Sequence, residues 1–547
     1  MNNHFRCMAL RGLSLFTAAA LLTACAASQA AAPATSESTA DEAVTFMAPY
    51  LNVEAFIDKV HSIYPEVNIE IVPYSGDNTT SCIQNMIEAH DLPDICTVTV
   101  YNPMTDDMSD QLIDLAGYDF TDNYIESRLQ EVTDNGAIYL LPSVYNCYGI
   151  TYNKTLLQQN GWTVPTSFAE LEQLAEKAEA AGVALCLPQS QYPGYGFQYM
   201  CNIADADFLG TLDGKRWQKD YLSGKANVSG TPGMMQAMAY IQKWRDIGML
   251  NGDGDPTSDE VTRQRMINGD ALFLLGSTNG IVEADGTRDK FGLMPYLSED
   301  GSQNVFVLSV NRYFGLNKRL EQNPQKLEDA LKVMRVLSTV EGTTALYPET
   351  KVKSSLMPFK NAKANDTYYT DIADALNFGS TAPFIYSGWE NTIVTTGNKM
   401  LDFMRGDATI DEVIAQLDGD QDKVVNNTPD LITTAAEDIP QEDCARLVGR
   451  CFAEATGSDL ALVSLGTWIS GNPTEQNHYG VSGKLYAKGL TDYDLSVILP
   501  TGWNRTIQTV TLTGSQINDL LTEGYDAYGN GKCYPCLLYT SPSPRDA

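Results

Sequence analysis

The hydrophobic positions of residues 43–425 change repeatedly between the two-residue period of strands and the three-to-four-residue period of helices. The pattern begins with a strand at 44–47, a helix at 53–64, a strand at 67–72, a helix at 79–89 and a strand at 95–100. This βαβαβ order predicts an α/β fold, in which helices cover both faces of a sheet with parallel strands. Ligands of such sheets bind beyond the carboxyl ends of the strands.

Residues 140–182 carry the most detailed local pattern. An extended run around Ile150 precedes a short helix at 155–160 that Gly161 closes. Ser167 then lies three residues before Glu170, which is the spacing of a capping box. Apolar residues recur at helical intervals after it, until Gly182 ends the second helix.

The charge of the chain is strongly negative, with 36 basic and 69 acidic residues and a formal net charge of −33. This charge argues against nucleic acid as a partner, because phosphate binding needs clustered lysine and arginine. The charge suits an exported, soluble protein. The length of 547 residues allows more than two ordinary domains.

The first residues have the features of an export signal. Arg6 and Arg11 precede an apolar run at 13–24, which is too short to be a transmembrane helix. The run ends Leu-Thr-Ala-Cys, which resembles a bacterial lipobox and implies lipidation of Cys25; the alternative is an ordinary cleaved signal followed by an incidental cysteine. We interpret 1–24 as a signal peptide and the Ala/Ser/Thr-rich residues 25–42 as a flexible tether. No later apolar run spans a bilayer, so lipid alone would hold the mature protein to the cell membrane, outside the cytoplasm.

Several motifs in consistent order resemble the extracellular solute-binding proteins of the sugar-binding family 1 type, the family of the maltose-binding protein. Within 140–182 these are Leu-Pro, a strand that ends in Tyr-Asn-Lys, Gly-Trp, and the helix start Pro-Thr-Ser-Phe. The others are "PDI" at 93–95, the segments 268–276 and 291–295, the helix 327–337 and the segment 387–391. The resemblance covers about 380 residues.

This resemblance implies a periplasmic-binding-protein-like fold of two hinged lobes, with the ligand between them. We expect one lobe at 43–144 and 280–345, and the other at 145–279 and 346–425. It also implies that the protein passes a sugar or oligosaccharide to the membrane subunits of an ABC importer. The chain has no GxxxxGK[ST] loop for ATP, which places the motor on other subunits.

Aromatic and amide side chains are the expected ligand contacts, because sugars present flat C–H faces and a rim of hydroxyls. Several such residues follow predicted strands or lie in the segments that resemble the family's ligand loops. The candidate ligand-binding residues are Tyr50, Asn52, Tyr74, Asp77, Tyr101, Asn102, Tyr145, Asn146, Tyr195, Ser277, Thr278 and Trp389. We expect Trp389 to be the main stacking platform, although each aromatic residue could instead be packing. Trp217 and Trp244, in amphipathic helical surroundings, are interpreted as packing residues.

The character of the sequence changes near Pro440. A helix at 445–456, a buried strand at 459–465 and two further strands at 497–504 and 506–516 predict a smaller α+β domain. With GKLYAKGLTDYDLSVILPTGW, these residues resemble the carboxy-terminal domain of 5′-nucleotidases over 440–535. The loop 466–469 reads Gly-Thr-Trp-Ile, without the arginine of the family's loop, which puts the usual substrate contacts in doubt.

Catalytic, cofactor and metal sites are not expected. The four histidines occur in no metallophosphoesterase motif, and the amino-terminal half of a nucleotidase is absent. Residues 251–260 alternate oxygen donors as an EF-hand loop does, but Pro256 and Thr262 replace the glycine and glutamate it needs, so we interpret them as solvated acidic surface. The cysteines have no zinc-type spacing, and we expect buried thiols at Cys82, Cys96, Cys147, Cys186, Cys201, Cys444, Cys451 and Cys533.

The last twelve residues, 536–547, have an unusual sequence. Residues 536–546 read CLLYTSPSPRD, which matches one reading frame of a widely used transposase sequencing adapter. We therefore expect 536–547 to be an artefact, and the natural chain to continue beyond Pro535. A disordered native tail is the alternative.

Two other functions stay open at this point. One is a surface receptor that binds a nucleoside or nucleotide through the carboxy-terminal domain. The other is a truncated hydrolase of the nucleotidase type.

Overall fold

The computed structural model describes residues 42–48, 53–72, 79–99, 108–251, 258–276, 288–347, 356–362, 372, 375–376, 381–385, 389–425, 431–463, 481, 483–498, 507–528 and 537–540. The chain divides into the units Met1–Asp41 and Glu42–Ala547, and all described residues belong to the second unit. The predicted signal peptide and Cys25 lie outside the described residues. No helix of the described part has the length and apolar character that crossing a membrane requires.

The first sheet has five strands in the order β2-β1-β3-β13-β6. Its strands are β1 (Val44–Phe46), β2 (Ile69–Ile71), β3 (Ile95–Val98), β6 (Leu141–Pro142) and β13 (Tyr313–Leu316). β1 is parallel to β2 and to β3, as the βαβαβ pattern predicts, whereas β13 is antiparallel to β3 and to β6.

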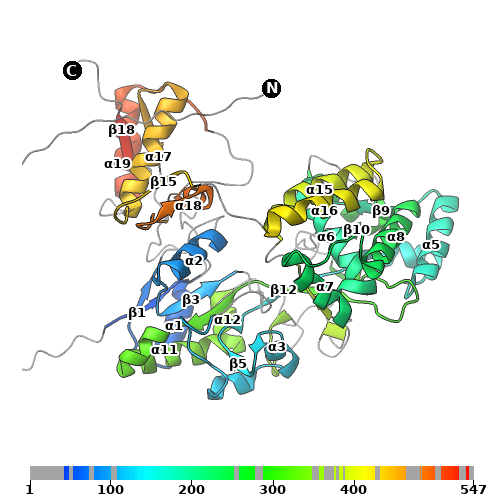
Figure 1. Ribbon diagram of the computed structural model, residues 1–547, viewed down its shortest axis with the longest axis horizontal. Helices are drawn as coiled ribbons and strands as arrows, with labels where there is room; N and C mark the ends of the chain where they lie inside the picture. Colours follow the sequence, from blue (N-terminus) through cyan, green and yellow to red (C-terminus); the bar gives the residue numbers. More distant parts are fainter. Residues whose placement is uncertain are drawn as a thin grey trace, which may run out of the picture. The chain divides into compact units, whose positions relative to one another are not determined.

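Helices pack against this first sheet (Figure 1). The helices are α1 (Val53–His61), α2 (Thr79–Glu88), α3 (Glu126–Gln130), α11 (Pro324–Leu337) and α12 (Val340–Leu346), with 3-10 turns at Asp119–Asn123 and Lys318–Gln322. A short hairpin of β4 (Thr133–Asp134) and β5 (Ala137–Ile138) lies in the same part of the chain. The core joins Phe46, Phe56 and Phe314, whose rings touch edge-on or tilted. We call this part the first lobe.

The second sheet has four strands in the order β11-β8-β10-β9. They are β8 (Ile150–Asn153), β9 (Ala184–Pro188), β10 (Ala271–Leu275) and β11 (Phe291–Met294). β9 and β10 are parallel, and β8 is antiparallel to both of its neighbours. We call this sheet and the helices that pack on it the second lobe.

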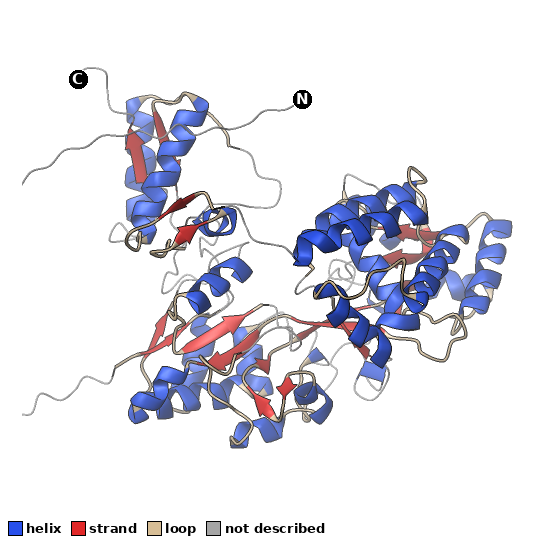
Figure 2. Cartoon of the chain, in the orientation of Figure 1, coloured by secondary structure: helices blue, strands red, loops and turns tan. Residues whose placement is uncertain are grey.

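The second lobe is rich in helices (Figure 2). They are α4 (Lys154–Asn160), α5 (Phe168–Ala181), α6 (Pro193–Ala204), the π-helical turn Asp205–Leu209, α7 (Leu212–Leu222), α8 (Pro232–Asp246), α9 (Asp259–Asn268), the 3-10 turn Arg288–Lys290, α15 (Glu390–Arg405) and α16 (Ile410–Val425). The predicted stops are confirmed, since Gly161 and Gly182 cap α4 and α5 with φ of 69° and 70°. Ser167 caps α5 as predicted, while the Glu170 carboxylate accepts from the Thr166 amide rather than from that of Ser167.

A three-stranded sheet joins the two lobes, and we call it the linking sheet. Its order is β14 (Thr381–Pro383), β12 (Phe306–Val310), β7 (Tyr145–Tyr148). β7 lies between β6 of the first sheet and β8 of the second along the chain, and β12 lies between β11 and β13. The chain therefore passes between the lobes in β7 and in β12, two antiparallel strands that are hydrogen-bonded to each other. It passes a third time between Phe359 of the first lobe and α15 of the second.

Gly149 lies at the turn from β7 into β8, where the chain packs closely against β11. A Cβ atom at this position would lie 2.6 Å from the Met294 carbonyl oxygen and 3.0 Å from the Leu293 side chain. Only glycine fits this approach without movement of the backbone.

The lobe limits expected from the sequence differ from those that the packing of the two cores shows. β11 belongs to the second sheet and Tyr296 to the core of the second lobe, so the return to the first lobe comes after 305 rather than at 280. Tyr347 and Phe359 belong to the core of the first lobe, so that lobe extends past 345. Strand-helix alternation could not show this, because both lobes have the same alternation.

The carboxy-terminal module comprises the described residues from 431 to 540. Its elements are β15 (Thr433–Thr434), α17 (Gln441–Thr456), β16 (Leu460–Val463), β17 (Gly489–Leu490), α18 (Asp492–Ile498), α19 (Gly514–Tyr528) and β18 (Leu537–Thr540). Cys444, Val448 and Leu485 belong to its small core. The helix and the strand predicted first are confirmed. Residues 507–513 form no strand, which corrects the strand predicted at 506–516. Of the strand predicted at 497–504, Val497 and Ile498 belong to α18 instead, and 499–504 lie outside the described residues.

The cysteines mostly confirm the prediction of buried thiols. Cys96, Cys147, Cys186, Cys201 and Cys444 are buried and not in disulfides. Cys82 is also buried, and Cys533 lies outside the described residues. Burial raises the pKa of the Cys444 thiol to about 11 and that of Cys96 to about 12. Cys451 is exposed, which corrects the prediction at that position, because it lies on the outer face of α17.

Candidate functional site

Most of the candidate ligand-binding residues lie outside the described part of the chain. These are Tyr50, Asn52, Tyr74, Asp77, Tyr101, Asn102, Ser277 and Thr278. The candidates that the structure places are Tyr145 and Asn146 on the linking sheet, and Tyr195 and Trp389 in the second lobe.

Tyr145 is held by an arginine and a glutamate of the first lobe. Its hydroxyl donates to Glu131 Oε2 at 3.1 Å, and the Arg128 guanidinium lies 4.9 Å from the centre of its ring. Arg128 and Glu131 pair at 2.7 Å. Burial and the adjacent Glu131 carboxylate raise the pKa of Tyr145 well above its usual value, so the hydroxyl stays protonated. This set fixes the start of β7 to the first lobe.

Asn146 faces the opposite side of β7 from Tyr145, because side chains alternate along a strand. It lies opposite Ser309 of β12 and is half-buried. Tyr148 shares its face and stacks on Phe384, with 5.2 Å between ring centroids. Asn146 is therefore a polar group on the linking sheet, beside an aromatic pair.

Three tyrosines of the second lobe form what we call the tyrosine ladder: Tyr192, Tyr195 and Tyr199. Tyr192 precedes α6, and the other two follow at one-turn spacings, so successive rings lie 6.1 Å apart. The buried Tyr199 hydroxyl lies 2.8 Å from the Gln189 carbonyl oxygen and 3.0 Å from that of Leu275. Both carbonyls lie at the carboxyl ends of β9 and β10, where ligands of α/β sheets bind.

Tyr192 and Tyr195 of the tyrosine ladder are half-buried. Tyr195 lies next to Tyr199, which contacts the carboxyl ends of β9 and β10, and its contact with a ligand stays a prediction. Tyr192 adjoins Tyr195 and is a further candidate that was not predicted from the sequence, although its spacing of three from Tyr195 at a helix start was an available signal.

Asp259 adds a carboxylate beside the tyrosine ladder. It is the first residue of α9, is 7% exposed, and its backbone amide donates to Gln191 Oε1 at 3.1 Å. Among the described residues, its Oδ1 atom has no hydrogen-bond partner. Burial raises the pKa of this carboxyl, and the Asp259 carboxylate helps to raise that of Tyr195. The hydroxyl group of a ligand could donate the hydrogen bond that this oxygen lacks.

The burial of Asp259 corrects the expectation that all of 251–260 is solvated surface. It belongs to the acidic stretch 251–260 that we expected to be solvated surface, and it is buried instead because the start of α9 packs beside Tyr195 and Gln191. Among the described residues, no three histidine, cysteine, aspartate or glutamate side chains cluster closely enough to hold a metal ion.

Trp389 lies in the hydrophobic core of the second lobe, and this corrects its interpretation as an open stacking platform. It is 3% exposed and stacks on Tyr221 with 4.6 Å between centroids and an interplanar angle of 4°. Phe197 and Trp217 pack around it at 5.9 and 6.2 Å. At this exposure the Trp389 ring is not accessible to a sugar, whereas Tyr195 is half-buried. Trp217 and Trp244 are buried packing residues, as predicted.

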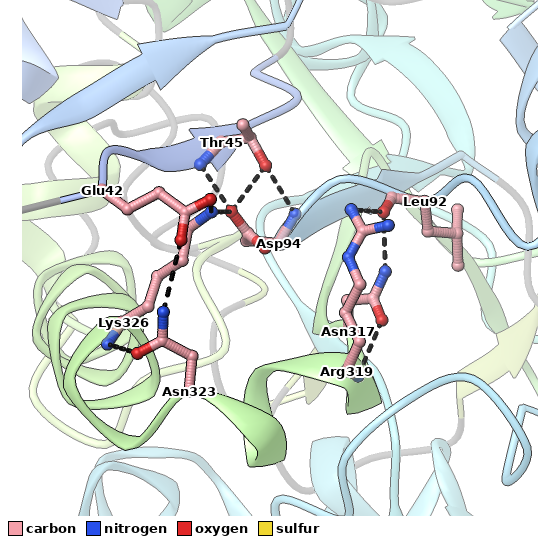
Figure 3. Close-up of polar contacts among 8 residues, drawn as sticks. All are labelled: Glu42, Thr45, Leu92, Asp94, Asn317, Arg319, Asn323 and Lys326. Atoms are coloured by element: carbon pink, nitrogen blue, oxygen red, sulfur yellow. Dashed lines mark hydrogen bonds and ion pairs between the residues drawn. The ribbon is translucent and has the colours of Figure 1, made fainter. Parts of the chain in front are cut away.

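A buried carboxylate ties the amino-terminal strand of the first lobe to α11 (Figure 3). Asp94 Oδ2 accepts from the Thr45 amide at 2.9 Å and from the Thr45 hydroxyl at 2.7 Å, and lies 2.8 Å from Lys326 Nζ. Burial alone would raise the pKa of Asp94, but Lys326 and Thr45 outweigh it and lower the pKa. Nearby, Asn317 and Arg319 both donate to the Leu92 carbonyl oxygen. These contacts hold the start of β3 against β1 and α11.

Comparison with known proteins gives a consistent result for the two-lobed part. The family model described as bacterial extracellular solute-binding protein matches residues 53–373. The maltodextrin-binding protein MdxE of Bacillus subtilis (strain 168) is 25% identical over 185 residues, 32% of this chain. The aligned part spans 40% of the length of that relative.

Solved structures show the same fold. The apo form of RafE from Streptococcus pneumoniae aligns with a TM-score of 0.55 at 15% identity, covering 70% of this chain and 98% of that one. A family 1 extracellular solute-binding protein from Bifidobacterium longum subsp. infantis aligns with a TM-score of 0.56 at 15% identity, covering 69% and 98%. At these identities the likeness concerns the fold.

Proposed function

The chain belongs to the family of bacterial extracellular solute-binding proteins, and from that premise we propose that it captures a sugar or oligosaccharide for an ABC importer. The tyrosine ladder with Asp259, at the carboxyl ends of β9 and β10, is the observation that carries this proposal. Rings suit the C–H faces of a sugar, and a carboxylate oxygen suits its hydroxyls.

The linking sheet supports a binding cycle by hinge motion. Two paired strands cross between the lobes, so a rotation at their ends can move one lobe against the other without breaking either sheet. A ligand held by both lobes would favour the closed form, which the membrane subunits of the importer would recognise. The binding protein itself would transform nothing.

Two relatives support the class of ligand. The curated relative is named for maltodextrin, and one RafE structure is described as a complex with raffinose. We extend this class, though not a particular sugar, to the present chain.

Lipidation at Cys25 is part of the proposal. It would tether the lobes outside the membrane through residues 26–42. Residues 440–535 would form a domain like the carboxy-terminal domain of 5′-nucleotidases, without a catalytic role.

Isothermal titration against raffinose, maltotriose and adenosine tests the proposal. We expect a sugar to bind and adenosine not to bind. Replacing Tyr195 by alanine should raise Kd at least tenfold, and Asp259→Asn should raise it about tenfold, since each removes a ligand contact of about 1.4 kcal/mol. Tyr118→Ala, which removes a half-buried tyrosine of the first lobe, is the matched control and should leave Kd unchanged. Binding of adenosine without binding of any sugar would contradict the proposal.

A further inference from the structure

The carboxy-terminal module contacts the first lobe through two lysines and a tyrosine. Lys484 Nζ lies 2.6 Å from Asp91 Oδ2, to which the Tyr486 hydroxyl also donates at 3.1 Å. Lys488 Nζ lies 2.6 Å from Glu88 Oε2 and 3.1 Å from Asn85 Oδ1. These groups belong to the end of α2 and the segment that follows it.

A cavity of about 420 Å³ lies beside these contacts, and both the first lobe and the module line it. This volume is in the range of small-molecule sites. The cavity lies apart from the tyrosine ladder, none of whose residues line it.

Asn85 gives the cavity an unmet hydrogen bond. The residue is 5% exposed, and its Oδ1 accepts from Lys488, while its Nδ2 has no acceptor among the described residues. Buried polar groups are nearly always paired, so an unpaired amide beside a cavity points to an acceptor that a ligand would bring.

The charged groups of the lining favour an anion. Arg319 and Lys484 are positive, against the single carboxylate of Asp91, which already accepts from Lys484 and Tyr486. The Arg319 guanidinium donates one bond to the Leu92 carbonyl oxygen at 2.7 Å, as Figure 3 shows, and has further N–H groups to offer. A local excess of positive charge is notable in a chain of net charge −33.

The rest of the wall is apolar, with Val72, Met86 and Val497 among its residues. From the unmet donor, the positive excess and this apolar wall, we propose that the cavity is a second binding site, for a small organic anion with an apolar body. The site is separate from the sugar site and does not depend on the proposed transport function.

Saturation-transfer NMR on the full chain with benzoate as the probe tests this inference, with neutral benzyl alcohol as the matched ligand. We expect benzoate to bind, and benzyl alcohol to bind at least fivefold more weakly. Asn85→Asp, which keeps the oxygen that accepts from Lys488 and replaces the donor by a charge, should reduce benzoate binding at least tenfold. Arg319→Gln should reduce it at least fivefold.

The controls separate this site from others. Lys318→Gln makes the same charge change next to Arg319 but outside the cavity, and should leave benzoate binding unchanged. Tyr195→Ala should also leave it unchanged. Circular dichroism will show whether the Asn85→Asp variant folds. If it does not fold, the Arg319→Gln variant decides, because Arg319 is exposed and its replacement should not prevent folding. Equal binding of benzyl alcohol, no effect of Arg319→Gln, loss of binding in Tyr195→Ala, or no benzoate binding would each overturn the inference.

Discussion

At the scale of single residues, Asp94 shows how one buried carboxylate can join two strands of a sheet to a helix. It is 2% exposed and accepts from both polar groups of Thr45 while it pairs with Lys326. Replacing it by asparagine removes the charge but leaves the lysine in place, and breaking a buried pair in this way is costly. We expect Asp94→Asn to lower the free energy of unfolding by about 3 kcal/mol in urea titrations.

Glu42→Gln is the matched control. Glu42 lies 3.6 Å from the same lysine but is 70% exposed, so its loss should change the unfolding free energy by less than about 1 kcal/mol. An equal effect of the two substitutions would contradict the role given to Asp94.

The same carboxylate predicts a pH dependence. Because its pKa is lower in the folded state than in the unfolded state, where it is about 3.9, folding is stabilised above that value. This contribution is lost as the pH falls through the lower folded pKa. The difference in unfolding free energy between the wild type and Asp94→Asn should therefore be full at pH 6 and shrink steadily below pH 4.

Trp389 gives a second prediction at this scale. Because its ring stacks on Tyr221 inside the second lobe, Trp389→Ala should lower the unfolding free energy by about 3–5 kcal/mol. Trp389→Phe should cost much less, since it keeps an aromatic ring in the stack. Wild-type stability of the alanine variant, with sugar affinity lost, would restore the ligand role that the sequence suggested.

At the scale of elements, local signals in the sequence predicted most boundaries. Gly161, Gly182 and the Ser167 cap fix α4 and α5 because capping depends on neighbouring residues. Partners that are distant in sequence were not predictable in this way. The burial of Trp389 depends on α6 and α7, and the burial of Asp259 depends on the segment before α6. The residues next to Trp389 and Asp259 in the sequence therefore did not indicate that either would be buried.

The turn between β7 and β8 allows a test at this scale. Gly149→Ala would push a methyl group against the Met294 carbonyl oxygen, and we expect a loss of about 1–3 kcal/mol in unfolding free energy. Gly419→Ala is the matched control, because nothing lies near a Cβ there and the residue is inside α16. It should stabilise the helix by about 0.5–1 kcal/mol. A harmless Gly149→Ala would mean that the strands are packed less closely than described.

At the scale of the whole molecule, the linking sheet predicts that ligand binding changes the dimensions of the protein. If a sugar draws the two lobes together, the radius of gyration from small-angle X-ray scattering should fall on addition of the sugar that binds in calorimetry. Tyr195→Ala should show no decrease at the same sugar concentration. Tight binding with an unchanged radius of gyration would contradict hinge closure.

Residues 536–547, which match a sequencing adapter, include the strand β18 of the carboxy-terminal module. β18 pairs with β16 through the backbone, but an open strand edge accepts many β-prone segments, so the pairing is compatible with a foreign origin. We expect deletion of 536–547 to leave sugar affinity unchanged.

The position of β13 has a consequence for how the protein is made. This strand lies between β3 and β6 in the first sheet, yet it follows the strands of the second sheet in the chain. The first sheet therefore cannot be completed until residues 313–316 have been synthesised. A chain that stops before residue 313 would lack the strand that pairs with both β3 and β6, and unpaired strand edges can pair with another copy.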